Sequence, residues 1–217
     1  MSNQIKNELY NIISGKSKIS HGAIIQTISC YLRECEKTSG ISKTEKHFKK
    51  QETTQLELFV SEHDLWFAGF DLSNYVSEGA EQRVYLKDEQ FVYKLNDSIY
   101  YESWVDYFDN LILHNYFFPD TCYQLLGFLK ENETLYCVVE QKFIQITSTT
   151  NLSHVKKFME SNGFLNIRNN DYKNNELGII IEDLHDENVL TNHGVLYFID
   201  TVFYLTPDFW DVSENKL

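Results

Sequence analysis

A turn followed by a short strand near the end of the chain constrains the fold more than any other segment. Residues 183–190 read Asp-Leu-His-Asp-Glu-Asn-Val-Leu, and the apolar run 195–199 ends in Asp200. Asp and Asn favour turns, and a run of large apolar and aromatic residues favours a strand. The segment therefore predicts a turn from Asp183 to Asn188 and a strand that brings Asp200 beside them.

These three polar side chains form a set with a definite chemistry. A carboxylate at Asp183 can orient a hydroxyl group and accept its proton during attack on a phosphate. Mg²⁺ takes hard oxygen ligands, a few from the protein and the rest from phosphate and water. An amide oxygen from Asn188 and a carboxylate from Asp200 are ligands of this kind. The three residues together favour a phosphoryl-transfer site that uses ATP and Mg²⁺. The alternative is that Asp183 and Asn188 only cap a turn, and that Asp200 is an ordinary polar strand end.

The upstream half of such a site would contain a glycine turn before two strands. Gly79, Ala80 and Glu81 form a turn with one glycine, which we expect to contact phosphate. Two strand-like runs follow at 83–86 and 91–94, with a polar hairpin connection between them.

Lys94 closes the second of these runs, where its ammonium group could reach the α- and β-phosphates. Residues 98–115 place apolar side chains at helical spacing, with acids on a neighbouring face. We select Glu102 as the helical acid that holds Lys94. The alternatives are that Lys94 is an edge-strand charge and that Glu102 is a solvated helix residue.

Two further strands are expected at 122–129 and 134–143. The second would end as a hinge at Glu140 and Gln141, whose backbone could bind the edge of an adenine ring. A helix over 151–162 and a hairpin of 164–168 with 177–181 then lead into Asp183. This order fits an α+β fold with two lobes, the second of them reduced.

The ordered motifs resemble the kinase-like domains of polyvalent proteins of phages and other bacterial mobile elements. The matching segments are Gly79-Ala80-Glu81-Gln82, Lys94, Asp183-Leu184-His185 with Asn188, and Phe198-Ile199-Asp200. The chain is more distantly similar to protein kinases and aminoglycoside phosphotransferases. The resemblance runs from about residue 75 to about residue 204. It implies that Lys94 binds phosphate, Asp183 is the base, and Asn188 and Asp200 hold metal.

Three functions remain open on this resemblance. We expect transfer of the γ-phosphoryl group of ATP to a hydroxyl acceptor, including protein Ser, Thr or Tyr. Gly79 is the only glycine of its turn, and Thr201 follows Asp200 where protein kinases carry Phe-Gly. The single glycine favours a pseudokinase that binds nucleotide and acts as an interaction module, while Thr201 limits the transfer from protein kinases. A small-molecule phosphotransferase is the further alternative.

Charge divides the chain unevenly. Residues 1–50 carry nine Lys and Arg against four acids, a charge of +5, and the remaining 10 basic and 28 acidic residues give −18, which together reproduce the total of −13. We expect a helical basic arm and linker over 1–55 and a kinase-like domain over 56–217. Its N-lobe would cover about 65–140 and its C-lobe about 141–217.

The arm is expected to contain helices at 4–13 and 21–36 and a hinge at 37–54, and it could bind a protein partner. An acidic body disfavours nucleic acid, because phosphate backbones require cations. The sequence has no run of eighteen apolar residues and no signal peptide, so we expect a cytoplasmic protein that does not enter a membrane.

Two competing motifs are weaker. Gly15-Lys16-Ser17 resembles the end of a phosphate-binding loop but lacks the earlier glycine and a preceding strand. His185, Asp186 and His193 suggest a metal-dependent phosphohydrolase, but such centres need more ligands than this segment offers. We expect His185 to stabilise its turn instead.

Overall fold

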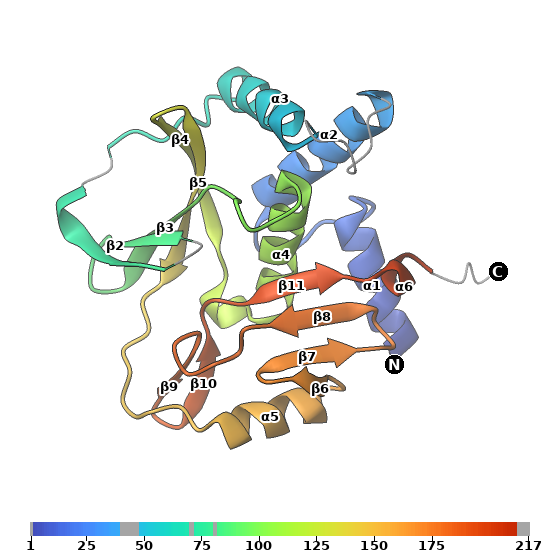
Figure 1. Cartoon of the computed structure of the whole chain (residues 1–217), viewed down its shortest axis with the longest axis vertical. Coiled ribbons are helices and arrows are strands. Elements are labelled where there is room, and N and C mark those ends of the chain that lie inside the picture. Colours follow the sequence, from blue (N-terminus) through green and yellow to red (C-terminus); the bar gives the residue numbers. More distant parts are fainter. Residues whose placement is uncertain (1, 40–47, 70–71, 80–81, 212–217) are drawn as a thin grey trace. The chain divides into compact units, whose positions relative to one another are not determined.

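The computed structural model describes residues 2–39, 48–69, 72–79 and 82–211 (Figure 1). Its internal contacts group the chain into two compact units, one of residues 20–143 and one of residues 1–19 with 144–217. The predicted division at residue 55 stays a prediction. The mixture of helix and sheet confirms the α+β class, while the two-lobe arrangement stays a prediction.

The unit of residues 20–143 is built on an antiparallel five-stranded sheet with the order β1-β2-β3-β5-β4. Two short 3-10 helices, η1 (Leu72–Asn74) and η2 (Pro119–Thr121), connect its elements. The strands are β1 (Tyr75–Glu78), β2 (Gln82–Leu86), β3 (Phe91–Asn96), β4 (Gln124–Glu131) and β5 (Thr134–Lys142). The predicted hairpins therefore form, because alternating apolar residues such as Tyr85, Leu95 and Val138 bury one face.

Helix α4 (Trp104–Phe117) is buried along most of its length and carries the core of this unit. Its Phe108 ring meets Phe128 of β4 edge-on, with 6.3 Å between the ring centroids. Helix α2 (Ala23–Ser39) packs on α4, where Arg33 forms an ion pair with the buried carboxylate of Asp109. Ser29 donates a further hydrogen bond to Asp109 at 3.1 Å.

Helix α4 begins later than the sequence predicts. The expected start at Ser98 is wrong, because Ser98 has a φ of 58° and the helix is capped by Ser103. Glu52, from a helix more than fifty residues away in sequence, also accepts hydrogen bonds from the backbone N–H groups of Trp104 and Val105, at 2.6 and 3.1 Å. These carboxylate oxygens satisfy donors that the helix cannot satisfy itself.

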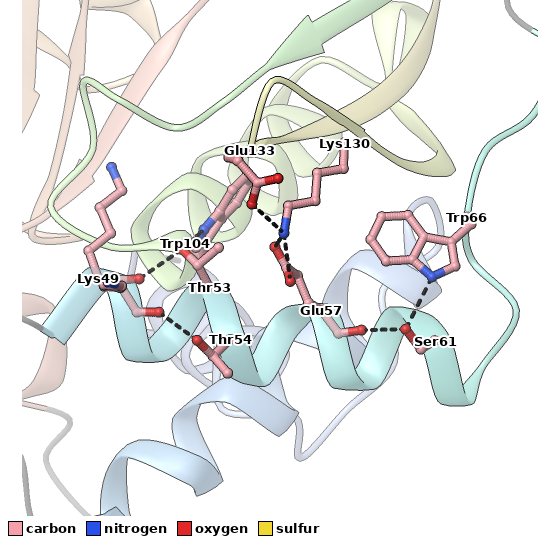
Figure 2. A network of polar contacts seen from close by, with 10 residues as sticks. Lys49, Thr53, Thr54, Glu57, Ser61, Trp66, Trp104, Lys130 and Glu133 are labelled. Atoms are coloured by element: carbon pink, nitrogen blue, oxygen red, sulfur yellow. Dashed lines mark hydrogen bonds and ion pairs between the residues drawn. The ribbon is translucent and has the colours of Figure 1, made fainter.

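Helix α3 (Phe48–Glu62) supplies Glu52 and occupies much of the segment that we expected to be a hinge. Its Thr53 accepts a hydrogen bond from the Trp104 indole at 3.0 Å, and its Glu57 forms an ion pair with Lys130 of β4 at 2.9 Å (Figure 2). The hinge prediction is therefore wrong for residues 37–39 and 48–54, and residues 40–47 lie outside the described part.

The unit of residues 1–19 and 144–217 contains a four-stranded antiparallel sheet with the order β11-β8-β7-β6 and a separate hairpin of β9 and β10. Helix α5 (Leu152–Ser161) begins after its Asn151 cap, as predicted, and contacts β6. The strands are β6 (Leu165–Arg168), β7 (Asp171–Asn174), β8 (Ile179–Glu182), β9 (Val189–Asn192), β10 (Val195–Phe198) and β11 (Val202–Leu205).

Helix α1 (Ser2–Ile13) belongs to this second unit, where it packs on the short helix α6 (Pro207–Trp210). Tyr10 meets Trp210 edge-on, with 6.1 Å between the ring centroids. The ammonium group of Lys6 donates to the carbonyl oxygen of Asp208 at 2.6 Å, near the C-terminal end of α6. The helices α1 and α2, predicted as parts of one arm, thus lie in different units.

Strands β7 and β11 were not expected from the sequence. The polar run of β7 resembles a turn, yet β7 pairs with both β6 and β8, and β8 also pairs with β11. The predicted direct pairing of 164–168 with 177–181 is therefore wrong, because β7 lies between them. Within the described residues, no helix is both long and apolar enough to cross a membrane.

Candidate functional site

The turn after β8 places Asp183 in an unusual backbone conformation. Asp183 has a φ of 68°, in the left-handed region that Asp and Asn tolerate better than most residues. Its backbone N–H donates to the Oδ1 atom of Asp171 at 3.1 Å, and the next N–H, of Leu184, donates to the carbonyl oxygen of Asn170 at 3.2 Å. Hydrogen bonds to residues at the start of β7 therefore fix the backbone of this turn, and the side chain of Leu184 is buried.

Asn188 and His185 both contact the Asp183 carboxylate. The Nδ2 atom of Asn188 donates to Oδ2 of Asp183 at 2.9 Å and to its carbonyl oxygen at 3.0 Å. His185 accepts a hydrogen bond at Nδ1 from the Glu187 N–H, so its Nε2 carries the proton and faces Oδ1 of Asp183 at 3.1 Å. The expected turn-stabilising role of His185 agrees with these bonds.

Asp200 is tied to the same turn through the backbone. The carbonyl oxygen of Asn188 accepts hydrogen bonds from the N–H groups of Ile199 at 2.9 Å and Asp200 at 3.4 Å. The unit of residues 1–19 and 144–217 thus brings Asp183, Asn188 and Asp200 together. Asp183 is exposed, whereas Asn188 and Asp200 are half-buried.

Two residues at this turn, Asn188 and Asp200, carry oxygen atoms of the kind that Mg²⁺ takes, and a metal site here stays a prediction. The amide nitrogen of Asn188 faces Asp183, and no hydrogen bond to its Oδ1 atom occurs among the described residues. Together with the Asp200 carboxylate it offers the hard oxygens that Mg²⁺ takes, with phosphate and water completing the shell. No group of three or more His, Cys, Asp or Glu side chains in the described ranges could hold a metal.

Lys94 lies in the other unit, on the central strand β3. It stands opposite Val84 of β2 and Val139 of β5, and only 3% of the residue is exposed. Its Nζ atom lies 5.4 Å from the centroid of the Tyr123 ring. A buried ammonium group needs such partners because its desolvation is costly. The alternative that Lys94 is an edge-strand charge is therefore wrong.

Sequence reasoning missed the buried polar groups beside Lys94. Burial lowers the pKa of His114 to about 3; a hydrogen bond to Thr121 opposes this shift, and the charge of Lys94 adds to it. The His114 ring is therefore neutral. Its Nε2 atom donates a hydrogen bond to the Thr121 carbonyl oxygen at 3.0 Å. One signal in the sequence could have revealed this cluster. Asn110 and His114 are polar residues four positions apart on the otherwise apolar helix α4.

Glu102 does not lie on α4. It is exposed in the turn before the Ser103 cap, so its predicted place on the helix is wrong. The acids of α4 have other partners, since Asp106 accepts a hydrogen bond from the Ser103 hydroxyl at 2.6 Å and Asp109 pairs with Arg33.

The predicted hinge residues lie within β5. Glu140 pairs through its carboxylate with Lys87, and Gln141 donates from Nε2 to the Thr121 carbonyl oxygen at 2.7 Å. Both backbones pair with β3, and the chain leaves the sheet after Lys142. Both side chains are therefore engaged, and binding of an adenine edge by the backbone here stays a prediction.

Gly79 directly follows β1, whereas Ala80 and Glu81 lie outside the described residues. Gly79 is exposed, and its N–H donates to the Gln82 carbonyl oxygen at 3.0 Å. A Cβ atom at Gly79 would meet only that oxygen, at 4.0 Å. The protein itself therefore has room for a side chain at this position.

A comparison with protein families decides the assignment. The chain matches the family described as "Serine/Threonine/Tyrosine Kinase found in polyvalent proteins" over residues 49–207. The chain belongs to this family. Both groups of site residues fall inside the matched range, which begins within α3 and ends within α6. A search of curated proteins finds no match. Membership of the polyvalent-protein kinase family supports a kinase-like phosphotransferase in general terms.

Proposed function

We propose that this polyvalent-protein kinase binds ATP with Mg²⁺ and transfers the γ-phosphoryl group to a hydroxyl acceptor. The observation that carries the proposal is the joining of Asp183, Asn188 and Asp200 by hydrogen bonds at one turn. Phosphoryl transfer depends mainly on positioning and charge, and this turn offers a carboxylate beside two oxygen ligands of the kind Mg²⁺ takes.

Each residue has a separate proposed role. Asp183 orients the acceptor hydroxyl and takes its proton at the exposed carboxylate, while Asn188 and His185 hold that carboxylate in place. Asn188 and Asp200 would hold Mg²⁺, which neutralises phosphate charge when bound. Lys94 would bind the α- and β-phosphates, and the backbone near Gly79 and after Glu140 would bind the remaining phosphate and adenine edges.

Mg-ATP should stabilise the chain against heat. Ligand at a hundred times its dissociation constant adds about 2.7 kcal/mol to the free energy of unfolding. We expect Asp200→Asn to lose the part of this gain that depends on Mg²⁺, because an amide is a weaker ligand than a carboxylate. Thermal unfolding with ATP, with and without Mg²⁺, measures both effects.

Asp186→Asn is the matched control, since Asp186 is exposed in the same turn and has no assigned role. It should keep the full Mg-ATP effect. Absence of any stabilisation of the unaltered chain by Mg-ATP would overturn the proposal, and equal behaviour of the two variants would remove Asp200 from the metal site.

Gly79→Ala should separate binding from stability. The site of the added Cβ is open, so we expect the unfolding midpoint to stay unchanged. If the backbone approaches a phosphate closely, the same methyl group should weaken ATP binding about tenfold, or about 1.4 kcal/mol. Calorimetric titration with Mg-ATP measures the affinity. Unchanged affinity would show that this turn does not contact nucleotide.

A pseudokinase is the second candidate, and the single glycine at position 79 favours it. Such a protein would gain stability from Mg-ATP but transfer no label from γ-labelled ATP to itself, to proteins or to small hydroxyl compounds. Label on a metabolite but not on protein would instead identify a small-molecule phosphotransferase.

A further inference from the structure

The two faces of the four-stranded sheet differ sharply. One face is buried, and its central row runs from Tyr172 through Ile181 to Phe203, each at most 2% exposed. Because strand residues alternate between faces, their neighbours in sequence lie on the opposite face. Figure 1 shows these four strands side by side, with α5 near the β6 edge.

The opposite face, which we call the open face, carries a row of mixed side chains. Register places Leu165, Lys173, Ile180 and Tyr204 in line across the four strands. Leu165 is 56% exposed and Tyr204 is 38% exposed, while the two residues between them are half-buried. Large apolar side chains left exposed together mark surfaces that bind partners.

A second row on the open face is acidic and adjoins the Asp183 turn. Asp171 pairs in register with Arg168, and Glu182 pairs with Val202. Asp171 accepts the hydrogen bond from the Asp183 N–H at 3.1 Å, so the row continues into the proposed base. Partial burial and the charge of Asp171 raise the pKa of Glu182, and Arg168 opposes the shift. Asp171, Glu182 and Asp183 thus supply three carboxylates near one guanidinium group, that of Arg168.

The dimensions of the open face favour a polypeptide. Strands lie about 4.8 Å apart, so the row from Leu165 to Tyr204 spans roughly 14 Å. From Ile180 to Asp183 the chain advances three residues, roughly 10 Å at about 3.3 Å per residue, which an extended acceptor segment would match with three residues of its own.

We propose that the open face docks the acceptor of the reaction, an extended polypeptide segment with an apolar residue about three positions from its hydroxyl and basic residues between. This inference rests on the proposed function, because it assumes that Asp183 is the base. The apolar residue would pack on Leu165, Ile180 and Tyr204, and the basic residue two positions further on would face Asp171 and Glu182, because side chains of an extended segment alternate between its two sides. Lys173 lies in the same row as Leu165 and Ile180. Its positive charge would repel a segment shifted so that its basic residues lay over that row.

Binding of two labelled peptides to the full chain tests the docking without nucleotide. The first carries a leucine three residues before its serine with two arginines between, and the second replaces the arginines by glutamates. Fluorescence anisotropy should show binding of the first peptide and at least tenfold weaker binding of the second. Leu165→Ser and Glu182→Gln should each weaken the first peptide severalfold.

Val195→Ser is the matched control, because Val195 is 52% exposed on the hairpin β9–β10 and has no assigned role. It should bind the first peptide as the unaltered chain does. Equal binding of both peptides, no binding, or binding unaffected by Leu165→Ser and Glu182→Gln would overturn the docking proposal. So would a dimer in sedimentation that Leu165→Ser abolishes, since a second copy would then cover the face.

Failure of docking and failure of the proposed function give different results. If Mg-ATP stabilises the chain but neither peptide binds, only the docking inference falls. If the arginine peptide binds as expected but Mg-ATP has no effect, the face is a binding surface and the phosphotransferase proposal falls. If both hold, the arginine peptide should accept label, and Leu165→Ser should raise its KM severalfold with little change in kcat.

Discussion

Asp183→Asn should lower the rate of phosphoryl transfer by about 10²- to 10⁴-fold, the contribution typical of a general base. Asparagine suits this test because it tolerates the left-handed backbone that Asp183 adopts, at a φ of 68°. It also keeps an oxygen that can accept the hydrogen bond from Asn188. The variant should therefore fold normally and still gain stability from Mg-ATP, while losing the group that accepts the proton. Initial rates of label transfer from γ-labelled ATP measure the effect.

Asp186→Asn again serves as the control, because it removes one carboxylate from the same turn without touching Asn188. It should leave the transfer rate within about twofold of the original, as expected for an exposed side chain away from the reacting groups. If Asp183→Asn retains full transfer, the base is a different residue. If the unaltered chain binds Mg-ATP but neither it nor the variant transfers label, the pseudokinase alternative is correct.

Arg33→Met should destabilise the chain by about 3–5 kcal/mol, because it removes one partner of a buried ion pair. The side chain of Asp109 is only 7% exposed. Burial raises the pKa of Asp109, and the charge and hydrogen bonds of Arg33 oppose that shift. Without the guanidinium group, the carboxylate on α4 must either stay charged without its main partner or take up a proton. Urea unfolding followed by circular dichroism measures the loss.

The double variant Arg33→Met with Asp109→Leu should recover most of this stability, since an apolar pair of similar size avoids the buried charge. Lys130→Met is the comparison for an exposed pair. Lys130 contacts Glu57 at the surface (Figure 2) and should matter little, because solvent screens the interaction. A loss for Arg33→Met no larger than that for Lys130→Met would show that α2 is not held on α4 by this pair.

The Asp183 turn was predictable because its contacts are short in sequence. The bonds that join Asp183, His185, Asn188 and Asp200 all lie within residues 183–200. Asp and Asn favour such turns, and the apolar run before Asp200 favours a strand. The position of Lys94 on a strand was predictable for a similar reason, since two adjacent runs of alternating residues favour a hairpin.

Glu102 was misplaced because a distant residue sets the start of α4. Helical periodicity is continuous from Ser98, but the free N–H groups of Trp104 and Val105 are satisfied by Glu52. The sequence around residue 102 does not show that Glu52 will cap the helix. For the same reason α3 was mistaken for a hinge, since its polar composition conceals how much of it is buried against α4.

The sequence by itself determined the local chemistry of this protein: which carboxylate and amide stand at one turn, which lysine stands on a strand, and an α+β class. Only the tertiary structure decided that Lys94 is buried on a central strand, that α1 packs on α6, and that β7 and β11 flank β8 to create an open face beside Asp183. The physical reason is range. Turn and strand preferences act between near neighbours, whereas burial and strand pairing depend on residues that meet only when the chain has folded.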